Sequence, residues 1–134
     1  MFGLTSQYAV RAVMHIAKSG EWCSKRDIAI ASGVASGYMS KVLQMLVDAG
    51  LLVSHRGFKG GYRLSRPPER VTVHDILQAT ETDGRLTTCS ACQLGHPALA
   101  CAVNRLLSGV RQDADHRLRQ TTIRDLLASC MPQR

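Results

Sequence analysis

The sequence has few acidic residues, few aromatic residues and no long apolar run. Ten Asp and Glu stand against seventeen Lys and Arg, which gives a formal net charge of +7, and aromatic residues make up 4% of the chain. No stretch approaches the ~18 apolar residues of a membrane span, and the first residues lack the charged and apolar regions of a signal peptide. We therefore expect a cytoplasmic protein without a membrane partner.

The positive charge is concentrated in the first half of the chain. Residues 1–70 hold ten Lys and Arg against four Asp and Glu, whereas residues 71–134 hold seven against six. A basic half beside a nearly neutral half indicates that the first half binds a polyanion, for which nucleic acid is the leading candidate. On charge alone, a generally basic and solvated surface is the alternative.

Three short helices are expected before residue 50. Apolar residues at helical spacing predict the first helix over 5–18. Ser24 and Asp27 have the spacing of a capping box, which predicts the start of a second helix. After a turn, Ser36 can cap a third helix that ends near Gly50.

The sequence after residue 50 predicts a β-hairpin. Residues 51–55 and 61–64 are expected to be its strands, and residues 56–60 between them contain the glycines of a tight tip. Helix, turn, helix and basic hairpin is the order of elements in a winged helix-turn-helix domain. We therefore expect a mainly α fold with a small β-hairpin wing (α+β).

The rest of the chain predicts further helices and a dimerisation seam. Thr72 and Asp75 form a second capping box ahead of a fourth helix, and Pro97 suits the first position of a longer one. A final short helix is expected around residues 123–127. The apolar series of the long helix is expected to join two copies of the chain, and consists of Leu99, Val103, Leu106 and Val110.

The candidate DNA contacts come from three places in the first half. The polar face of the third helix suits a major groove about 12 Å wide. The basic hairpin and the start of the second helix suit phosphates. These residues are Ser24, Lys25, Ser40, Lys41, Gln44, Arg56, Lys59, Gly60 and Arg63. For any one of them, a structural glycine or a solvated side chain is the alternative.

Several stretches resemble one known family. They are Tyr-Ala-Val-Arg-Ala at 8–12, Tyr-Met-Ser-Lys-Val-Leu at 38–43, Leu-Val-Asp-Ala-Gly-Leu at 46–51 and Arg-Gly-Phe-Lys-Gly-Gly-Tyr-Arg-Leu at 56–64. The resemblance is to the Rrf2 family of winged helix-turn-helix transcriptional regulators, and it covers nearly the whole chain. It implies a homodimeric repressor of double-stranded operator DNA with no small-molecule substrate. It also brings Ser36 and Tyr38 into the DNA-contacting set.

The resemblance divides the chain into three units. Residues 1–82 are expected to form the DNA-binding domain, residues 83–96 a cysteine-containing sensor loop, and residues 97–134 the dimerisation helix with a short final helix. Occupancy of the sensor loop is expected to set the geometry of the two DNA-reading heads.

Three of the five cysteines cluster around the sensor loop. Cys89, Cys92 and Cys101 lie within thirteen positions. Because cytoplasmic thiols are kept reduced, metal ligation suits them better than disulfide bonds. Thiolates bind both iron-sulfur clusters and zinc. His96 inside the loop is a candidate fourth ligand, and with it the three cysteines would make a closed zinc site.

The resemblance favours an iron-sulfur cluster, [2Fe-2S] or [4Fe-4S], over zinc, thiol redox sensing or no cofactor. Cys89 and Cys101 are twelve positions apart, as in the iron-sulfur members of the family. The middle cysteine departs from the family pattern, because Cys92 lies three positions after Cys89 and the centre of the interval is Gly95. The residue that serves as the fourth cluster ligand in members of the family has no counterpart at the matching position of this sequence.

An enzyme is the rival class of function. Cys89 and Cys92 form a Cys-x-x-Cys pair, which a thiol oxidoreductase would use. Against this, the pair does not follow a strand-helix-strand pattern, and no candidate base accompanies it. The isolated Cys23 and Cys130 are expected to be small apolar fillers. We therefore expect a regulator and not an enzyme.

Overall fold

The computed structural model describes residues 3–80 and 97–130, except for the side chains of residues 97–101, 103, 104 and 107. Its elements are α1 (Leu4–Ser19), α2 (Lys25–Ser32), α3 (Ser36–Asp48), β1 (Leu52–His55), β2 (Gly61–Leu64), η1 (Pro68–Arg70), α4 (Val73–Thr80), α5 (Pro97–Gln120) and α6 (Ile123–Cys130). The two strands pair antiparallel, with Leu52 opposite Leu64. This confirms the expected fold class.

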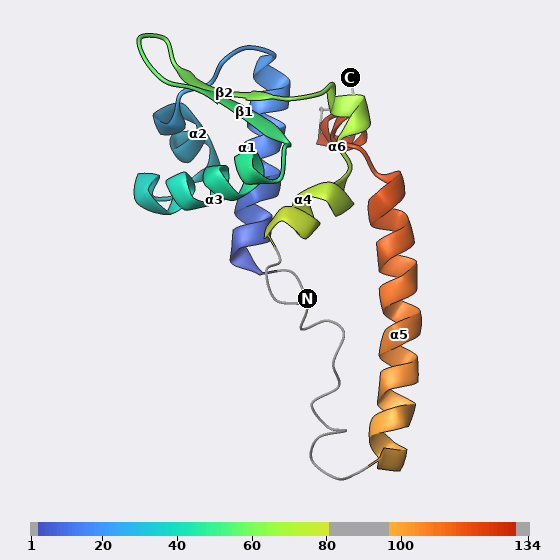
Figure 1. The fold of residues 1–134 in the computed structure, drawn as a ribbon. Coiled ribbons are helices and arrows are strands. Elements are labelled where there is room, and N and C mark those ends of the chain that lie inside the picture. Colours follow the sequence, from blue (N-terminus) through green and yellow to red (C-terminus); the bar gives the residue numbers. More distant parts are fainter. Residues whose placement is uncertain (1–2, 81–96, 131–134) are drawn as a thin grey trace.

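One helix lies at the centre of the head, by which we mean residues 3–80 together with α6. α1 packs against α2, α3, α4, α6 and β2. Figure 1 shows α2 and α3 on one side of α1, with α4 and α6 toward the other. The large core side chains come from all of these helices, and include Ile16, Ile28, Met39, Leu43, Leu46, Ile76 and Ile123. The helix-turn-helix therefore rests on the same core as the rest of the head.

The predicted capping box at Thr72 is complete, and the one at Ser24 shows its N-cap hydrogen bond. The Asp27 backbone N–H donates to the Ser24 hydroxyl over 3.1 Å at the start of α2. Ahead of α4, the Asp75 N–H donates to the Thr72 hydroxyl and the Thr72 N–H donates to the Asp75 carboxylate, over 3.2 and 3.1 Å. These bonds satisfy N–H groups that the first helical turn leaves without a partner.

The predicted cap of α3 is wrong by one residue. Ala35 has the extended backbone of an N-cap, with φ −58° and ψ 138°, and makes no side-chain cap. Ser36 is already the first helical residue, so its hydroxyl is not in the capping position. The first turn of α3 thus begins without a side-chain cap.

A long helix leaves the head and a short one returns to it. α5 has 24 residues, a length of about 36 Å at 1.5 Å per residue, and Figure 1 shows most of it running away from the head. Its last turns contact α4, where His74 Nε2 lies 3.1 Å from Asp115 Oδ1. Along the described ranges, no helix is both apolar and long enough to cross a bilayer.

α6 is fastened to the head at its first turn. The Ile123 N–H donates to the Val71 carbonyl over 2.9 Å. Thr122 and Asp125 form a third capping box, and these hydrogen bonds hold the pKa of Asp125 below its ordinary value. Since the side chain of Ile123 is fully buried, α6 belongs to the core of the head.

Candidate nucleic-acid interface

α3 presents one apolar face to the core and one polar face to solvent. Its buried side chains are Met39, Val42, Leu43 and Leu46. On the other face, Gly37, Lys41 and Gln44 are exposed. A polar helix face that stands free of the core is what a major groove can accept.

Two predicted base-reading residues are held by bonds within α3. The Ser40 hydroxyl donates to the Ser36 carbonyl over 3.2 Å, so its oxygen lone pairs are left to accept. Gln44 Nε2 donates to Asp48 Oδ1 over 2.8 Å. This bond orients the amide of Gln44 along the helix and leaves its carbonyl oxygen for another donor.

Tyr38 contacts α1. Its hydroxyl forms a hydrogen bond with the Thr5 hydroxyl. Its ring meets the Tyr8 ring edge to face, with 5.7 Å between centroids, and the Arg11 guanidinium lies 5.9 Å from the centroid of Tyr8. Tyr38 therefore braces the start of α3 against α1, a role that sequence reasoning missed.

The wing is bonded to the start of α2. Cys23 pairs with Tyr62 of β2 through two backbone hydrogen bonds, of 2.9 Å from the Cys23 N–H and 2.8 Å from the Tyr62 N–H. The hairpin and the residues that begin α2, among them Ser24 and Lys25, are thus fixed relative to one another. Cys23 is buried, as expected, whereas Cys130 is exposed and is not the apolar filler that we predicted.

Close backbone approach explains two of the wing glycines. A β-carbon on Gly61 would lie 2.3 Å from the carbonyl oxygen of Cys23, and one on Gly60 would lie 2.4 Å from the carbonyl oxygen of His55. Neither oxygen can move without breaking the hairpin or its bond to α2. Both glycines are therefore required for steric reasons. For Gly60 this requirement is compatible with the predicted DNA contact.

Gly61→Ala should lower the free energy of unfolding by about 1–3 kcal/mol, because the methyl group would overlap backbone atoms. Thermal or chemical unfolding measures the change. Gly37→Ala is the matched control, since nothing lies within 4 Å of a β-carbon there and alanine is the better helix former by about 1 kcal/mol. Equal stabilities for the two variants would contradict the steric role of Gly61.

The base of the wing holds one of the predicted phosphate contacts. The guanidinium of Arg63 lies 4.8 Å from the ring centroid of Trp22, which is cation–π distance. The Trp22 ring also contacts the His55 ring, with 5.6 Å between the two ring centroids. Arg63 therefore has a defined position. Trp22 is the single tryptophan of the chain, so its fluorescence reports on this region.

The tip of the wing is a tight turn. The Gly60 N–H donates to the Gly57 carbonyl over 2.9 Å. Lys59 has a φ of 63° and Gly57 a φ of 118°. The side chain of Phe58, between them, is 94% exposed. Sequence reasoning did not single out Phe58, although its place between Arg56 and Lys59 in a glycine-rich tip was visible.

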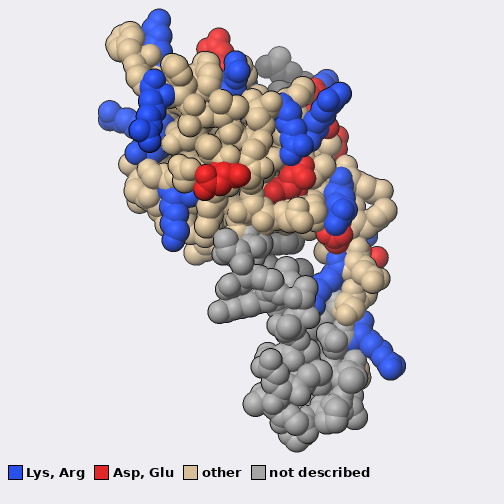
Figure 2. All heavy atoms as spheres, in the orientation of Figure 1, with Lys and Arg blue, Asp and Glu red and all other residues tan. Residues whose placement is uncertain are grey.

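The basic residues of this surface have no acidic partners among the described residues. The ion pairs lie elsewhere, around η1, α4, α5 and α6, and are Arg66–Asp75, His74–Asp115, Arg119–Asp115 and Arg124–Glu69. Figure 2 shows Lys and Arg side chains projecting on the side of the wing and α2. The charge of Lys25, Lys41, Arg56 and Lys59 is thus available to a polyanion.

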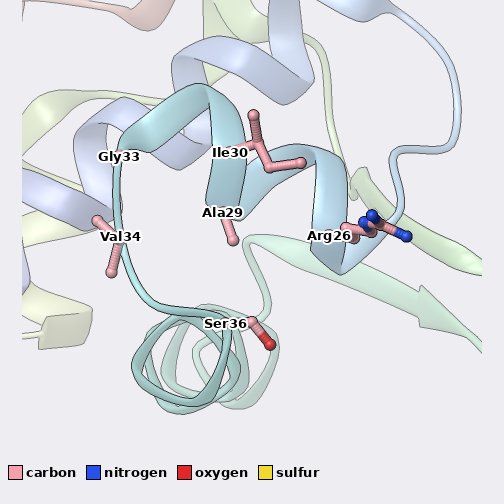
Figure 3. A pocket seen from close by; sticks show the side chains of 6 residues that line it. All are labelled: Arg26, Ala29, Ile30, Gly33, Val34 and Ser36. Carbon is pink, nitrogen blue, oxygen red and sulfur yellow. The ribbon is translucent and has the colours of Figure 1, made fainter.

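A groove of about 380 Å³ runs between α2 and the start of α3. Its walls are mainly apolar, from Ala29, Ile30 and Val34, with Arg26 and Ser36 beside them (Figure 3). The groove contains neither a carboxylate nor a thiol. Within residues 3–80 and 97–130, no three His, Cys, Asp or Glu side chains gather in a way that would hold a metal ion.

The predicted metal ligands fall mostly where the structure gives no description. Cys89, Cys92 and His96 lie outside the described residues. Cys101 belongs to the beginning of α5, but its side chain is also outside them.

Two of the four predicted dimer residues are described, and both are exposed. Leu106 is 71% exposed and Val110 is 44% exposed. The side chains of Leu99 and Val103 lie outside the described residues.

Comparison with known proteins adds a family and a set of related structures. The family model described as "Rrf2: Iron-dependent Transcriptional regulator" matches residues 4–129. Protein aau3 of Rhizobium meliloti is 36% identical over 129 residues, which are 92% of this chain and 84% of that protein.

Two of the solved structures cover this whole chain at 25% identity. T. potens IscR superposes with a TM-score of 0.76, and the match covers 93% of that chain. Staphylococcus aureus CymR in its oxidized form superposes with a TM-score of 0.78, and the match covers 99% of that chain.

Proposed function

This chain belongs to the Rrf2 family of helix-turn-helix transcriptional regulators, and on that premise we propose that it represses transcription by binding palindromic operator DNA as a homodimer. α3 enters the major groove and the wing lies beside it on the sugar-phosphate backbone. Membership of a regulator family also removes the thiol oxidoreductase that the Cys-x-x-Cys pair suggested.

One observation carries this proposal. The polar face of α3, the start of α2 and the wing are held relative to one another, because α3 packs against α2 and β1, and because Cys23, just before α2, pairs with Tyr62 of the wing. Lys41, Arg56 and Lys59 on this surface make no ion pair among the described residues. Phosphates would supply the missing negative charge, while Ser40 and Gln44 face the bases.

Selection from a library of random duplexes tests the proposal. The wild-type chain should enrich a palindrome whose half-sites lie about one helical turn apart, or a multiple of it. The duplex so obtained serves as the operator in the experiments below. Failure to enrich any sequence, with no binding to unselected duplexes, would contradict the proposal.

We further propose that Cys89, Cys92 and Cys101 hold an iron-sulfur cluster. The donor set fits, since thiolates are the ligands that such clusters prefer. The description of the matched family as iron-dependent supports iron over zinc. When bound, the cluster supplies a group that oxidants, nitric oxide or iron shortage can remove. Zinc held by the same cysteines with His96 is the second candidate, because three thiolates and one imidazole complete a tetrahedral site.

The position of Cys101 suggests how occupancy would reach the DNA-binding surface. Asp115, which contacts His74 of the head, lies fourteen residues further along α5, or about 21 Å at 1.5 Å per residue. Ligands at the Cys101 end of α5 therefore act on the head through the helix or through the partner copy. A ligand shifts such an equilibrium to the extent that it favours one arrangement.

Loss of the cluster should change operator affinity about 5- to 150-fold, the usual range for coupled sites. Cys89→Ser and Cys101→Ser should each abolish iron and acid-labile sulfide in anaerobically purified protein. Cys23→Ser is the matched control and should retain both, because Cys23 is buried under the wing. Metal and sulfide analysis with binding titrations of holo and apo protein measures these effects.

Three outcomes would contradict parts of this proposal. Stoichiometric zinc without sulfide would replace the cluster by the zinc site. Equal operator affinities of holo and apo protein at one salt concentration would leave a DNA-binding protein whose cysteines are not the sensor. Full cluster occupancy in Cys92→Ser would remove Cys92 from the ligand set.

A further inference from the structure

The wing tip exposes the largest solvated apolar group of the head. Phe58 is 94% exposed. It is one of two phenylalanines in the chain. An aromatic side chain that is buried in a contact removes 150–250 Å² from water. Because Phe58 is exposed, it buries almost none of this area in the fold of the single chain.

The turn itself holds Phe58 at the apex. Gly57 and Gly60 close the turn, and Phe58 is the second of its four residues. The next residue, Lys59, has a φ of 63°, a left-handed conformation that is unfavourable for a residue with a side chain. A tip with glycine at 59 would avoid that cost and lose a positive charge. The observed tip presents an aromatic ring with a cation beside it.

The wing is also stiff below the tip. Its second strand is bonded to Cys23, just before α2, and Arg63 and His55 pack on Trp22. A tip that is fixed relative to α3 meets the DNA at a defined distance from the bases that α3 contacts. Phe58 is therefore placed to act at one particular base step.

We propose that Phe58 is an apolar wedge that enters the minor groove next to the major groove occupied by α3. This rests on the proposed DNA-binding function. Arg56 and Lys59 hold the phosphates on the two edges of the groove, and the ring inserts partly between two base pairs. Apolar side chains used in this way unstack the step and kink the duplex toward the major groove.

The charge around Phe58 favours DNA over a protein partner. Arg56 and Lys59 flank it, and the described residues offer neither of them a carboxylate. DNA provides both phosphates and an apolar stack of bases. Because pyrimidine–purine steps unstack most easily, we expect Phe58 to make the chain prefer such a step at the wing position, which α3 does not reach.

Phe58→Ala tests the wedge. Its affinity for the selected operator should fall roughly tenfold for each of the two copies of the chain, within the range measured for loss of base–aromatic stacking. The salt dependence of binding should be unchanged, because no charge is lost. The bend of the operator, measured by energy transfer between dyes on its two ends, should decrease. Selection with the variant should lose the preferred pyrimidine–purine step and keep the bases specified by α3.

Matched variants separate the ring from its surroundings. Phe58→Leu keeps an apolar wedge and should retain most of the affinity and the bend. Lys59→Ala keeps the ring and should reduce the salt dependence instead. The melting temperature of Phe58→Ala should equal that of the wild type, since the ring is exposed.

Other results would overturn the wedge. An operator affinity and bend equal to those of the wild type in Phe58→Ala would remove Phe58 from the interface, while the DNA-binding proposal would stand on the wild-type selection. Weaker dimerisation of Phe58→Ala with an unchanged bend would assign the ring to a protein contact. If the wild-type chain bound no duplex, the proposed function and the wedge would both fall.

Discussion

Operator affinity of the dimer should fall roughly 10³- to 10⁵-fold when the salt concentration rises from 50 to 200 mM. Each phosphate that a Lys or Arg neutralises releases counterions, and six to ten such contacts give a loss of this size. Lys25, Lys41, Arg56 and Lys59 are exposed and, among the described residues, make no ion pair with an acid. Two copies of the chain supply enough of these residues for the expected number of contacts.

The fluorescence of Trp22 and a labelled duplex can both follow the titration. Lys59→Ala should reduce the slope of log affinity against log salt by about one for each copy of the chain, and should weaken binding to all sequences alike. Gln44→Ala is the uncharged control: it should keep the slope and relax the preference at one base pair of each half-site. An affinity that is flat from 50 to 200 mM would contradict the electrostatic interface.

Local signals in the sequence predicted most of the fold. The N-cap at Ser24 and the capping box at Thr72 were found because each depends on residues three positions apart. The amphipathic face of α3 and the hairpin follow in the same way from spacing and from glycines. The cap of α3 was misplaced because Ala35 has no side-chain signal, whereas Ser36 after it does.

Contacts between distant residues were beyond this reasoning. The DNA contact predicted for Tyr38 stays a prediction, and the sequence contained no sign that its hydroxyl meets Thr5, 33 positions away. The bond between the wing and α2 joins Cys23 to Tyr62, and neither side chain takes part in it. For the same reason, the sequence placed Gly61 at the start of a strand without indicating why it is a glycine, while the atom that requires a glycine there belongs to Cys23. Backbone pairing of this kind leaves no pattern in either segment alone.

Leu106→Glu should convert the proposed homodimer into monomers and reduce operator affinity by about two orders of magnitude or more. In the single chain Leu106 is 71% exposed and Val110, one turn further along α5, is 44% exposed. An exposed apolar pair on a helix that runs away from the head indicates a partner surface. A glutamate in the seam between two such helices would be an unpaired charge without water, which a dimer does not tolerate.

The loss of operator affinity follows from the loss of linkage between two heads. In a dimer, binding of one head holds the second near its half-site at an effective concentration that a free monomer does not reach. Gln112→Glu adds the same charge on another side of α5, at an exposed position, and should leave both the dimer and the affinity intact. Sedimentation velocity at micromolar concentration measures the oligomeric state. A Leu106→Glu chain that stays fully dimeric there would show that this face of α5 is not the interface.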